Sequence, residues 1–195
     1  MESLDSYLQN LASGDPVPGG GSAASVIGAI AAALVAMVGR IAACAPADLS
    51  QQADELRAQL MEARGCDEQA YAAVVAAQAL PKADDSQRMA RRVALDTALK
   101  GAAQAPLAAA KLALGVLELV ERLLDLSMGA LVSDVACAAE FAYAAVTACG
   151  YNVRINHRYM RDETLIREQA AELVRIEGRS AEILLRARRA VASRR

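Results

Sequence analysis

Aromatic residues are scarce in this chain of 195 residues, which has no Trp, one Phe and five Tyr. Alanine takes their place and supplies about a quarter of the chain. Alanine is the best helix former and a poor strand former, so the composition argues against β-sandwiches and β-barrels. Apolar residues make up 55% of the sequence, which excludes wholesale disorder. We therefore predict an all-α fold whose core is thin, because each small side chain buries little surface.

Histidine and paired cysteines are also nearly missing. The chain has one His and four Cys, and no two of these cysteines form a Cys-x-x-Cys pair. A structural zinc site needs such ligands at close spacing, so we expect no metal. No signal-peptide pattern opens the sequence, and the apolar stretch 23–38 is short for a membrane span. We expect a cytoplasmic protein with reduced thiols that does not contact a membrane.

Charge is nearly balanced overall but not along the chain. The net charge is -2, whereas residues 151–195 hold 11 Arg against 6 Asp and Glu. A basic segment of this kind is typical of nucleic-acid or membrane binding. Here acidic residues alternate with the arginines, and no stacking aromatics accompany them. We interpret the segment as a solvated helix face and expect no nucleic-acid partner.

Apolar periodicity and capping residues divide the chain into helices separated by short breaks. The predicted helices cover about residues 4–11, 23–41, 48–79, 87–104, 106–126, 132–149 and 162–192. We expect Pro106 to start or kink one helix and Gly150 to end another. No strand pattern with turn chemistry occurs. The sequence thus predicts a single domain over residues 1–195, an up-and-down bundle of about six to eight helices.

A glycine-rich turn precedes the most apolar predicted helix. It reads Pro16-Val17-Pro18-Gly19-Gly20-Gly21-Ser22. Glycines let a ligand approach the backbone, and the free N–H groups of a helix start favour a carboxylate, phosphate or carbonyl oxygen. The pattern lacks the Lys of a P-loop and follows no strand, which disfavours a nucleotide site. A ligand site and a tight turn between closely packed helices both remain open.

Five elements, in order and over about residues 3–190, together resemble the cyclodeaminase/cyclohydrolase family. The first is the glycine-rich turn with the small-residue helix that follows it. The others are Asp67-Glu68-Gln69-Ala70-Tyr71, Leu80-Pro81-Lys82, Ala98-Leu99-Lys100 with Pro106-Leu107, and Ser133-Asp134 followed by Asn152-Val153-Arg154-Ile155-Asn156. The family includes formiminotetrahydrofolate cyclodeaminases and bacterial methenyltetrahydrofolate cyclohydrolases.

Two departures from the family pattern concern the substrate more than the fold. The family usually has a Gly-Lys-rich stretch after the first buried helix, where this chain has residues 42–47 without a Lys. It also has two asparagines before the Ser-Asp pair, where this chain has Met128 and Ala130. These replacements remove a cationic patch and two polar contacts.

The resemblance implies an enzyme that acts on the one-carbon C–N bridge of a folate, as a methenyltetrahydrofolate cyclohydrolase or a formiminotetrahydrofolate cyclodeaminase. It implies no cofactor, since the tetrahydrofolate derivative is the substrate, and a homodimer, which the thin alanine core also favours. A chain of this size without a formiminotransferase domain favours the cyclohydrolase. Two alternatives stay open: a family member acting on another C–N bond, in a non-folate amidine, imine or cyclic amine, and a catalytically inactive helical binding protein.

Three side chains are candidates for the proton transfers that either reaction needs. Asp134 would stabilise a cationic amidine, and Lys82 or Lys100 would transfer a proton if burial lowers its pKa. The structural alternatives are a helix cap for Asp134 and solvated or ion-paired lysines. The predicted substrate-binding residues are Pro18, Gly19, Gly20, Gly21, Ser22, Ser133, Asn152 and Asn156. The two asparagines would bind a pterin edge, or else shape a turn after Gly150.

Overall fold

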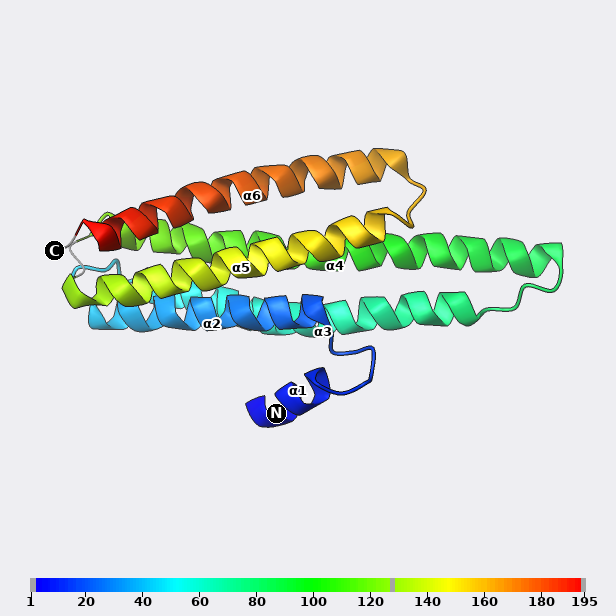
Figure 1. Cartoon of the computed structure of the whole chain (residues 1–195), viewed down its shortest axis with the longest axis horizontal. Helices are drawn as coiled ribbons and strands as arrows, with labels where there is room; N and C mark the ends of the chain where they lie inside the picture. The colour runs from blue at the N-terminus through cyan, green and yellow to red at the C-terminus, as the bar shows by residue number, and fades with distance from the viewer. Residues whose placement is uncertain (1–2, 127–128, 194–195) are drawn as a thin grey trace.

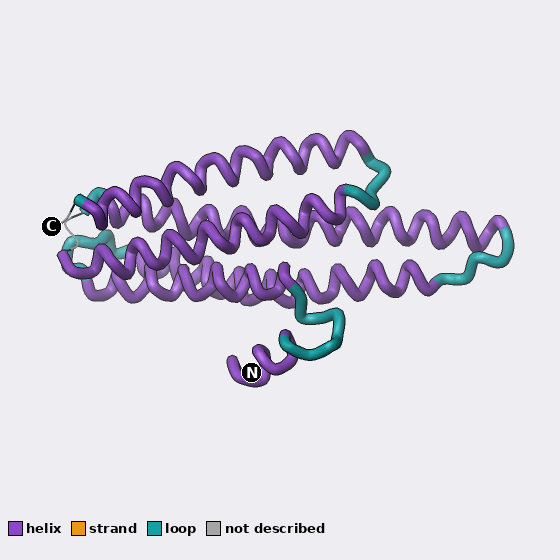
Figure 2. The backbone as a smooth tube through the Cα atoms, in the orientation of Figure 1, coloured by secondary structure: helices purple, strands orange, loops and turns teal. Residues whose placement is uncertain are grey.

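The computed structural model describes residues 3–126 and 129–193. In those ranges it contains six α-helices and one short 3-10 helix, in agreement with the predicted all-α fold. They are α1 (Leu4–Leu11), α2 (Gly20–Ile41), α3 (Leu49–Ala79), α4 (Asp85–Leu124), η1 (Gly129–Leu131), α5 (Val132–His157) and α6 (Glu163–Ala192). Helices α2 to α6 run alternately up and down one long axis, whereas α1 projects from the bundle near the start of α2 (Figures 1 and 2).

Side chains cap three of the six α-helices, whereas α2, α3 and α5 have no side-chain cap. Ser3, Asp84 and Asp162 accept hydrogen bonds from the first turns of α1, α4 and α6. The cap position of α2 is Gly19, which has no side chain to offer. The first turn of α2 therefore depends on partners from elsewhere in the fold.

Pro106 does not divide α4, contrary to the prediction of two helices at 87–104 and 106–126. The helix runs unbroken from Asp85 to Leu124 and buries Pro106. A proline has no N–H, so the carbonyl of Ala102, four residues earlier, loses its helical donor. The side-chain amide of Asn156 on α5 donates to that carbonyl at 2.8 Å instead. A tertiary hydrogen bond thus replaces the one that the proline removes.

Gly150 does not end α5 either, although the sequence predicted a stop there. The helix continues to His157, which places Asn152 and Asn156 on a helix and not in a turn. A Cβ on Gly150 would lie 2.5 Å from a carboxylate oxygen of Glu177, which is paired with Arg154. The glycine costs about 1 kcal/mol of helix propensity and gives this ion pair its room.

The core lies between α2, α4 and α5 and consists mainly of alanine, valine and leucine. Fully buried members include Ala31, Val35, Val116, Leu117, Ala138 and Ala142. Helix α2 and the segment Gly129–His157 are long and apolar enough to span a membrane by length and composition. In the bundle, 61% of the apolar window of α2 is buried, as in the central helix of a globular core.

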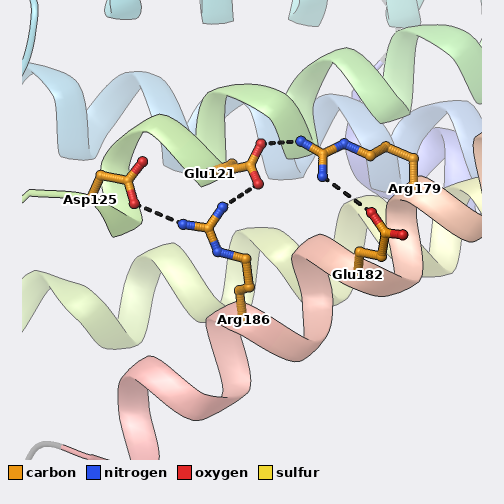
Figure 3. Close-up of polar contacts among 5 residues, drawn as sticks. All are labelled: Glu121, Asp125, Arg179, Glu182 and Arg186. Atoms are coloured by element: carbon orange, nitrogen blue, oxygen red, sulfur yellow. Dashed lines mark hydrogen bonds and ion pairs between the residues drawn. The ribbon is translucent and has the colours of Figure 1, made fainter.

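Arginines of α6 form ion pairs with the neighbouring helices. Glu121 on α4 accepts hydrogen bonds from both Arg179 and Arg186, and Arg186 also contacts Asp125 at 2.7 Å (Figure 3). Between α5 and α6, Arg188 of α6 pairs with Glu140 of α5, and Arg154 of α5 pairs with Glu177 of α6. Among the 11 arginines of residues 151–195, five thus form ion pairs within the described part of the fold: Arg154, Arg175, Arg179, Arg186 and Arg188.

Replacing Glu121 with Gln is expected to lower the free energy of unfolding by about 1–2 kcal/mol, because the half-buried carboxylate holds two guanidinium groups. Its side chain is 17% exposed. Glu182 contacts the same Arg179 but is 69% exposed, so Glu182→Gln should cost less than about 0.5 kcal/mol. Urea denaturation of the two variants measures this difference. Equal losses of unfolding free energy would contradict the role of Glu121 in holding the two arginines.

Candidate active site

A pocket of about 540 Å³ opens beside the first turn of α2, between α3, α4 and α5. This volume is typical of small-molecule sites. Its polar lining comes from Gly19, Gly20, Gly21, Asp67, Gln78, Asn152 and Asn156. Its apolar and aromatic lining comes from Pro16, Val17, Ala70, Tyr71, Val74, Leu95, Leu99, Ala102, Ile155 and Tyr159. The glycine-rich turn and the two asparagines, far apart in sequence, thus meet in one concave site.

Asp67, in the middle of α3, lies directly against the backbone of the glycine-rich turn. A Cβ on Gly21 would be 2.3 Å from a carboxylate oxygen of Asp67, so no side chain fits at position 21. The backbone N–H of Ser22 donates to this carboxylate. Asp67 therefore supplies the cap that Gly19 lacks, with its negative charge at the positive end of α2.

The carboxyl group of Asp67 has a pKa above its ordinary value. Burial raises the pKa of Asp67 above 3.8 because desolvation disfavours the charged form. The Ser22 N–H acts in the opposite direction, and the nearby charge of Glu68 raises the pKa further. A carboxyl group that lines a pocket with a raised pKa is suited to exchange a proton with a ligand.

Ser22 and Pro18 do not line this pocket, and their role in substrate binding stays a prediction. The Ser22 hydroxyl is buried and hydrogen-bonds Tyr7 of α1 at 2.9 Å and Glu68 of α3 at 3.0 Å. Arg64 lies over the Tyr7 ring, 4.9 Å from its centroid. Ser22 is thus part of a polar chain behind the turn that attaches α1 to the bundle.

The two asparagines present acceptors to the pocket. The amide nitrogen of Asn152 donates to the Ala148 carbonyl at 2.9 Å, and that of Asn156 donates to the carbonyls of Ala102 and Asn152. Both side-chain N–H groups of Asn156 and one of Asn152 are thus engaged with the backbone, and the two amide oxygens can accept from a ligand. With the Asp67 carboxylate, the site is therefore rich in acceptors.

Aromatic side chains are present at the pocket despite their scarcity in the sequence. Tyr71 of α3 and Tyr159, just after α5, both line it and are well exposed. Leu95 and Leu99 of α4 add apolar surface. A flat heterocycle can therefore stack on the pocket wall while its edge meets the polar groups.

A family model described as formiminotransferase-cyclodeaminase matches residues 3–175. The chain belongs to this family. Its homologues are cyclohydrolase and cyclodeaminase enzymes that act on folate C–N bonds.

Methenyltetrahydrofolate cyclohydrolase of Methylorubrum extorquens is 34% identical over 181 residues, which are 88% of this chain and 87% of that protein. Formimidoyltransferase-cyclodeaminase of Rattus norvegicus is 29% identical over 175 residues, but this chain spans only 31% of its length. The crystal structure of formiminotetrahydrofolate cyclodeaminase from Thermotoga maritima superposes with a TM-score of 0.85 at 26% identity, covering 98% of this chain and 96% of that one.

The two candidate lysines lie outside the pocket. Lys100 pairs with Asp96 at 3.1 Å and Asp162 at 3.0 Å. Hydrogen bonds to Asp162 and Asp96 raise the pKa of Lys100, which opposes the lowered pKa that proton transfer would require. Lys82 lines a separate, cationic cleft next to the pocket. Within this chain, neither ammonium group therefore lies in the pocket, where it could transfer a proton to a ligand.

Ser133 and Asp134 lie at the opposite end of α5 from Asn152. At about 1.5 Å of rise per residue the separation is about 27 Å. Ser133 donates to the Ala130 carbonyl, and Asp134 stands in the first turn of α5 without capping it. The structure thus places neither residue at this pocket within one chain. Ala130 lies in the short 3-10 helix η1, and Met128 lies outside the described residues.

His157 and Arg154 have structural partners. The imidazole of His157 hydrogen-bonds Gln169 at 2.9 Å, and Arg154 forms two contacts with Glu177. Within residues 3–126 and 129–193, no three His, Cys, Asp or Glu side chains gather as a possible metal site.

Asp67 is the site residue that sequence reasoning did not select. It belongs to one of the five family elements, in which two adjacent acidic residues interrupt an alanine-rich helix. That acidic pair marks the helix but does not select Asp67, because exposed helix faces also carry carboxylates and the contact with Gly21 comes from the fold. The pairing itself joins residues 46 positions apart, as the Ser22–Glu68 contact shows.

Cys149 lies on α5 near Asp67, and we expect its thiol to be unreactive. It is 1% exposed, and burial together with the Asp67 charge raises its pKa to about 12. Cys44, Cys66 and Cys137 are exposed thiols. Titration with a disulfide reagent near pH 8 should label three thiols in the native protein and the fourth only after unfolding, because the thiolate is the reactive form. Rapid labelling of all four would contradict the burial of Cys149.

Proposed function

We propose that this protein is a methenyltetrahydrofolate cyclohydrolase, which adds water to the methenyl bridge of a folate. Membership of the family supports folate chemistry, and the relative with that activity matches this chain over nearly its full length. The observation that carries the proposal is the Asp67 carboxyl group, held at the pocket by a glycine turn and with a raised pKa.

The pocket chemistry fits the pterin end of a folate. A pterin edge presents amide and amine N–H donors, and the amide oxygens of Asn152 and Asn156 are available to accept them. Tyr71 and Tyr159 offer faces on which the ring can stack. The carboxylate of Asp67 favours the positive charge of a methenyl bridge over a neutral ring.

The reaction needs one group that accepts and then returns a proton. As water attacks the bridge carbon, Asp67 accepts one of its protons and a neutral tetrahedral adduct forms. Asp67 then gives that proton to one bridge nitrogen as its bond to carbon breaks. The hydroxyl of the adduct loses its proton to solvent and becomes the formyl oxygen on the other nitrogen. A raised pKa suits both proton transfers, because the pKa of the carboxyl group then lies nearer the pH at which the enzyme works.

Loss of methenyltetrahydrofolate absorbance with the purified protein tests the proposal. We expect saturable turnover above the rate in buffer, together with a rise in melting temperature when the folate binds. Release of ammonia from formiminotetrahydrofolate, without cyclohydrolase turnover, would assign the chain to the cyclodeaminase reaction. Absence of both activities would overturn the folate assignment.

We also propose a cytoplasmic homodimer joined through α1, α2 and α3. A groove of about 700 Å³ runs between these helices, and Ile30 and Met61 expose 45% and 43% of their surface there. Burying such a surface against a second copy would add core that the alanines do not supply. The four reduced cysteines suit a reducing compartment.

Ile30→Glu is expected to convert the dimer to a monomer, because it places a charge in the proposed apolar interface. Light scattering after gel filtration measures the mass of each species. Val174→Glu, on the exposed surface of α6, should leave the dimer intact and is the matched control. A wild-type protein that is monomeric at micromolar concentration would contradict the dimer.

A further inference from the structure

Helix α1 lies outside the bundle and contacts it through Tyr7 (Figure 1). Among the eight residues of α1, Tyr7 is the buried one, whereas Leu4 and Leu8 are exposed. The phenol hydroxyl of Tyr7 reaches the Ser22 hydroxyl at 2.9 Å, and the guanidinium group of Arg64 lies over the ring. Tyr7 therefore docks α1 beside the first turn of α2, directly behind the active-site pocket.

The direction of the Tyr7–Ser22 hydrogen bond follows from the other partner of Ser22. The Ser22 hydroxyl donates to a carboxylate oxygen of Glu68 at 3.0 Å, and a hydroxyl has only one hydrogen to donate. Tyr7 is therefore the donor to Ser22. Ser22 is fully buried, so solvent cannot replace this donor when it is lost.

Ser22 is the first residue of α2 that has a side chain to hold the start of the helix. Residues 19–21 are all glycine, which loses the most backbone freedom in a helix, so this first turn depends on contacts from outside. The Ser22 backbone N–H donates to Asp67, whereas its hydroxyl contacts Tyr7 and Glu68. Ser22 thus connects α1 to the carboxyl group in the pocket.

We propose that Tyr7 is a positioning residue for the reaction, which holds the Ser22 N–H against the Asp67 carboxyl group. The inference rests on the proposed function, in which Asp67 accepts and returns the proton. Pro16 and Val17, between α1 and α2, line the pocket, so docking of α1 also holds this part of the pocket wall in place.

The acidity of Asp67 should report a change in this contact. Two titratable groups lie near Asp67: Glu68 of its own helix raises its pKa, and Cys149 of α5, with a pKa of about 12, is a neutral thiol. The residues of α2 and α4 that line the pocket carry no titratable group. The Ser22 N–H lowers the pKa of Asp67, so a loosened first turn should raise that pKa.

The pH profile of Tyr7→Phe tests the proposal. This variant removes the donor and keeps the ring beside Arg64. We expect KM for methenyltetrahydrofolate to rise about threefold, and the pH below which kcat/KM falls to move upward. Tyr151→Phe, at an exposed tyrosine of α5 outside the pocket, is the matched control and should change neither value. An equal loss of kcat at every pH, without a shift of the profile, would overturn the proposal, because it would mean that Tyr7 only stabilises the fold.

Ser22→Ala tests the route through which Tyr7 acts. It removes the hydroxyl that accepts from Tyr7 and keeps the backbone N–H that donates to Asp67. Adding Tyr7→Phe to Ser22→Ala should therefore shift the pH profile no further than Ser22→Ala alone. Additive shifts would overturn the route through Ser22.

Hydrogen exchange of the Ser22 amide, followed by NMR, needs no substrate and separates this inference from the proposed function. The amide should exchange about tenfold faster in Tyr7→Phe than in the wild type, and at the wild-type rate in Tyr151→Phe. Faster exchange in a protein that turns over neither folate would support the positioning role while the proposed function fails. Equal exchange in Tyr7→Phe and wild type would overturn the positioning role, whatever the activity.

Discussion

Replacing Asp67 with Asn is expected to lower kcat for cyclohydrolysis by about 10²–10⁴-fold, the usual contribution of a general acid–base group. The amide keeps the shape of the carboxyl group and an oxygen that can accept from the Ser22 N–H, so the cap on α2 survives. It cannot accept the proton of the attacking water. Steady-state kinetics with methenyltetrahydrofolate measure the loss, and circular dichroism verifies the fold.

The matched control is Glu68→Gln, one residue further along α3. Glu68 accepts from the Ser22 hydroxyl at 3.0 Å but does not line the pocket. Its neutralisation should leave kcat within about twofold of wild type, since it removes charge near the site without removing the proton acceptor. Equal losses in both variants would mean that Asp67 acts only through the packing of α2 on α3.

The pH dependence gives an independent test of the same residue. Asp67 must be ionised to accept a proton, so kcat/KM should fall as the pH drops through its pKa, which burial raises above 3.8. The Asp67→Asn variant has no such group, and the acidic limb should disappear from its profile.

The raised pKa of Asp67 also affects stability. A folded-state pKa above the unfolded value means that Asp67 contributes stability below the unfolded pKa and that this contribution is lost as the pH rises. The Asp67→Asn variant should therefore be at least as stable as wild type at neutral pH.

Local sequence signals predicted the helices well and their interruptions poorly. Alanine content, periodicity and caps such as Asp84 act within a few residues, so the positions of most helices could be inferred without a structure. Pro106 and Gly150 carry equally strong local signals, yet both lie inside helices. Partners distant in sequence decide these two cases: Asn156 takes the carbonyl freed by Pro106, and the Arg154–Glu177 pair occupies the space above Gly150.

The site residues also fall into those that sequence signals predict and those that depend on contacts distant in sequence. The glycine-rich turn and the two asparagines could be predicted, since helix-start chemistry and family order point to them. Asp67 could not be singled out, because its role arises from contact with Gly21 on another helix. Ser22 follows Gly21 directly, but a helix turns about 100° per residue, so its side chain faces α1 and α3 and not the pocket.

Asn156→Ala is expected to cost about 1–3 kcal/mol of stability as well as weakening folate binding, because it removes two hydrogen bonds at once. Its amide nitrogen donates to the Ala102 carbonyl at 2.8 Å and to the Asn152 carbonyl at 2.9 Å. Without it the Ala102 carbonyl, buried in α4 and deprived of its helical donor by Pro106, has no partner. Urea denaturation and KM for methenyltetrahydrofolate measure the two effects.

Pro106→Ala should rescue the stability of this variant but not its substrate binding. Alanine restores an N–H at position 106, which can donate to the Ala102 carbonyl as in any regular helix. A double-mutant cycle between positions 106 and 156 should therefore show a coupling of about 1–2 kcal/mol. Asn152→Ala is the control on the same helix: its amide donates to the Ala148 carbonyl, within its own helix, so Pro106→Ala should not rescue it. Additive effects at 106 and 156 would mean that the carbonyl finds another donor and that Asn156 serves the pocket alone.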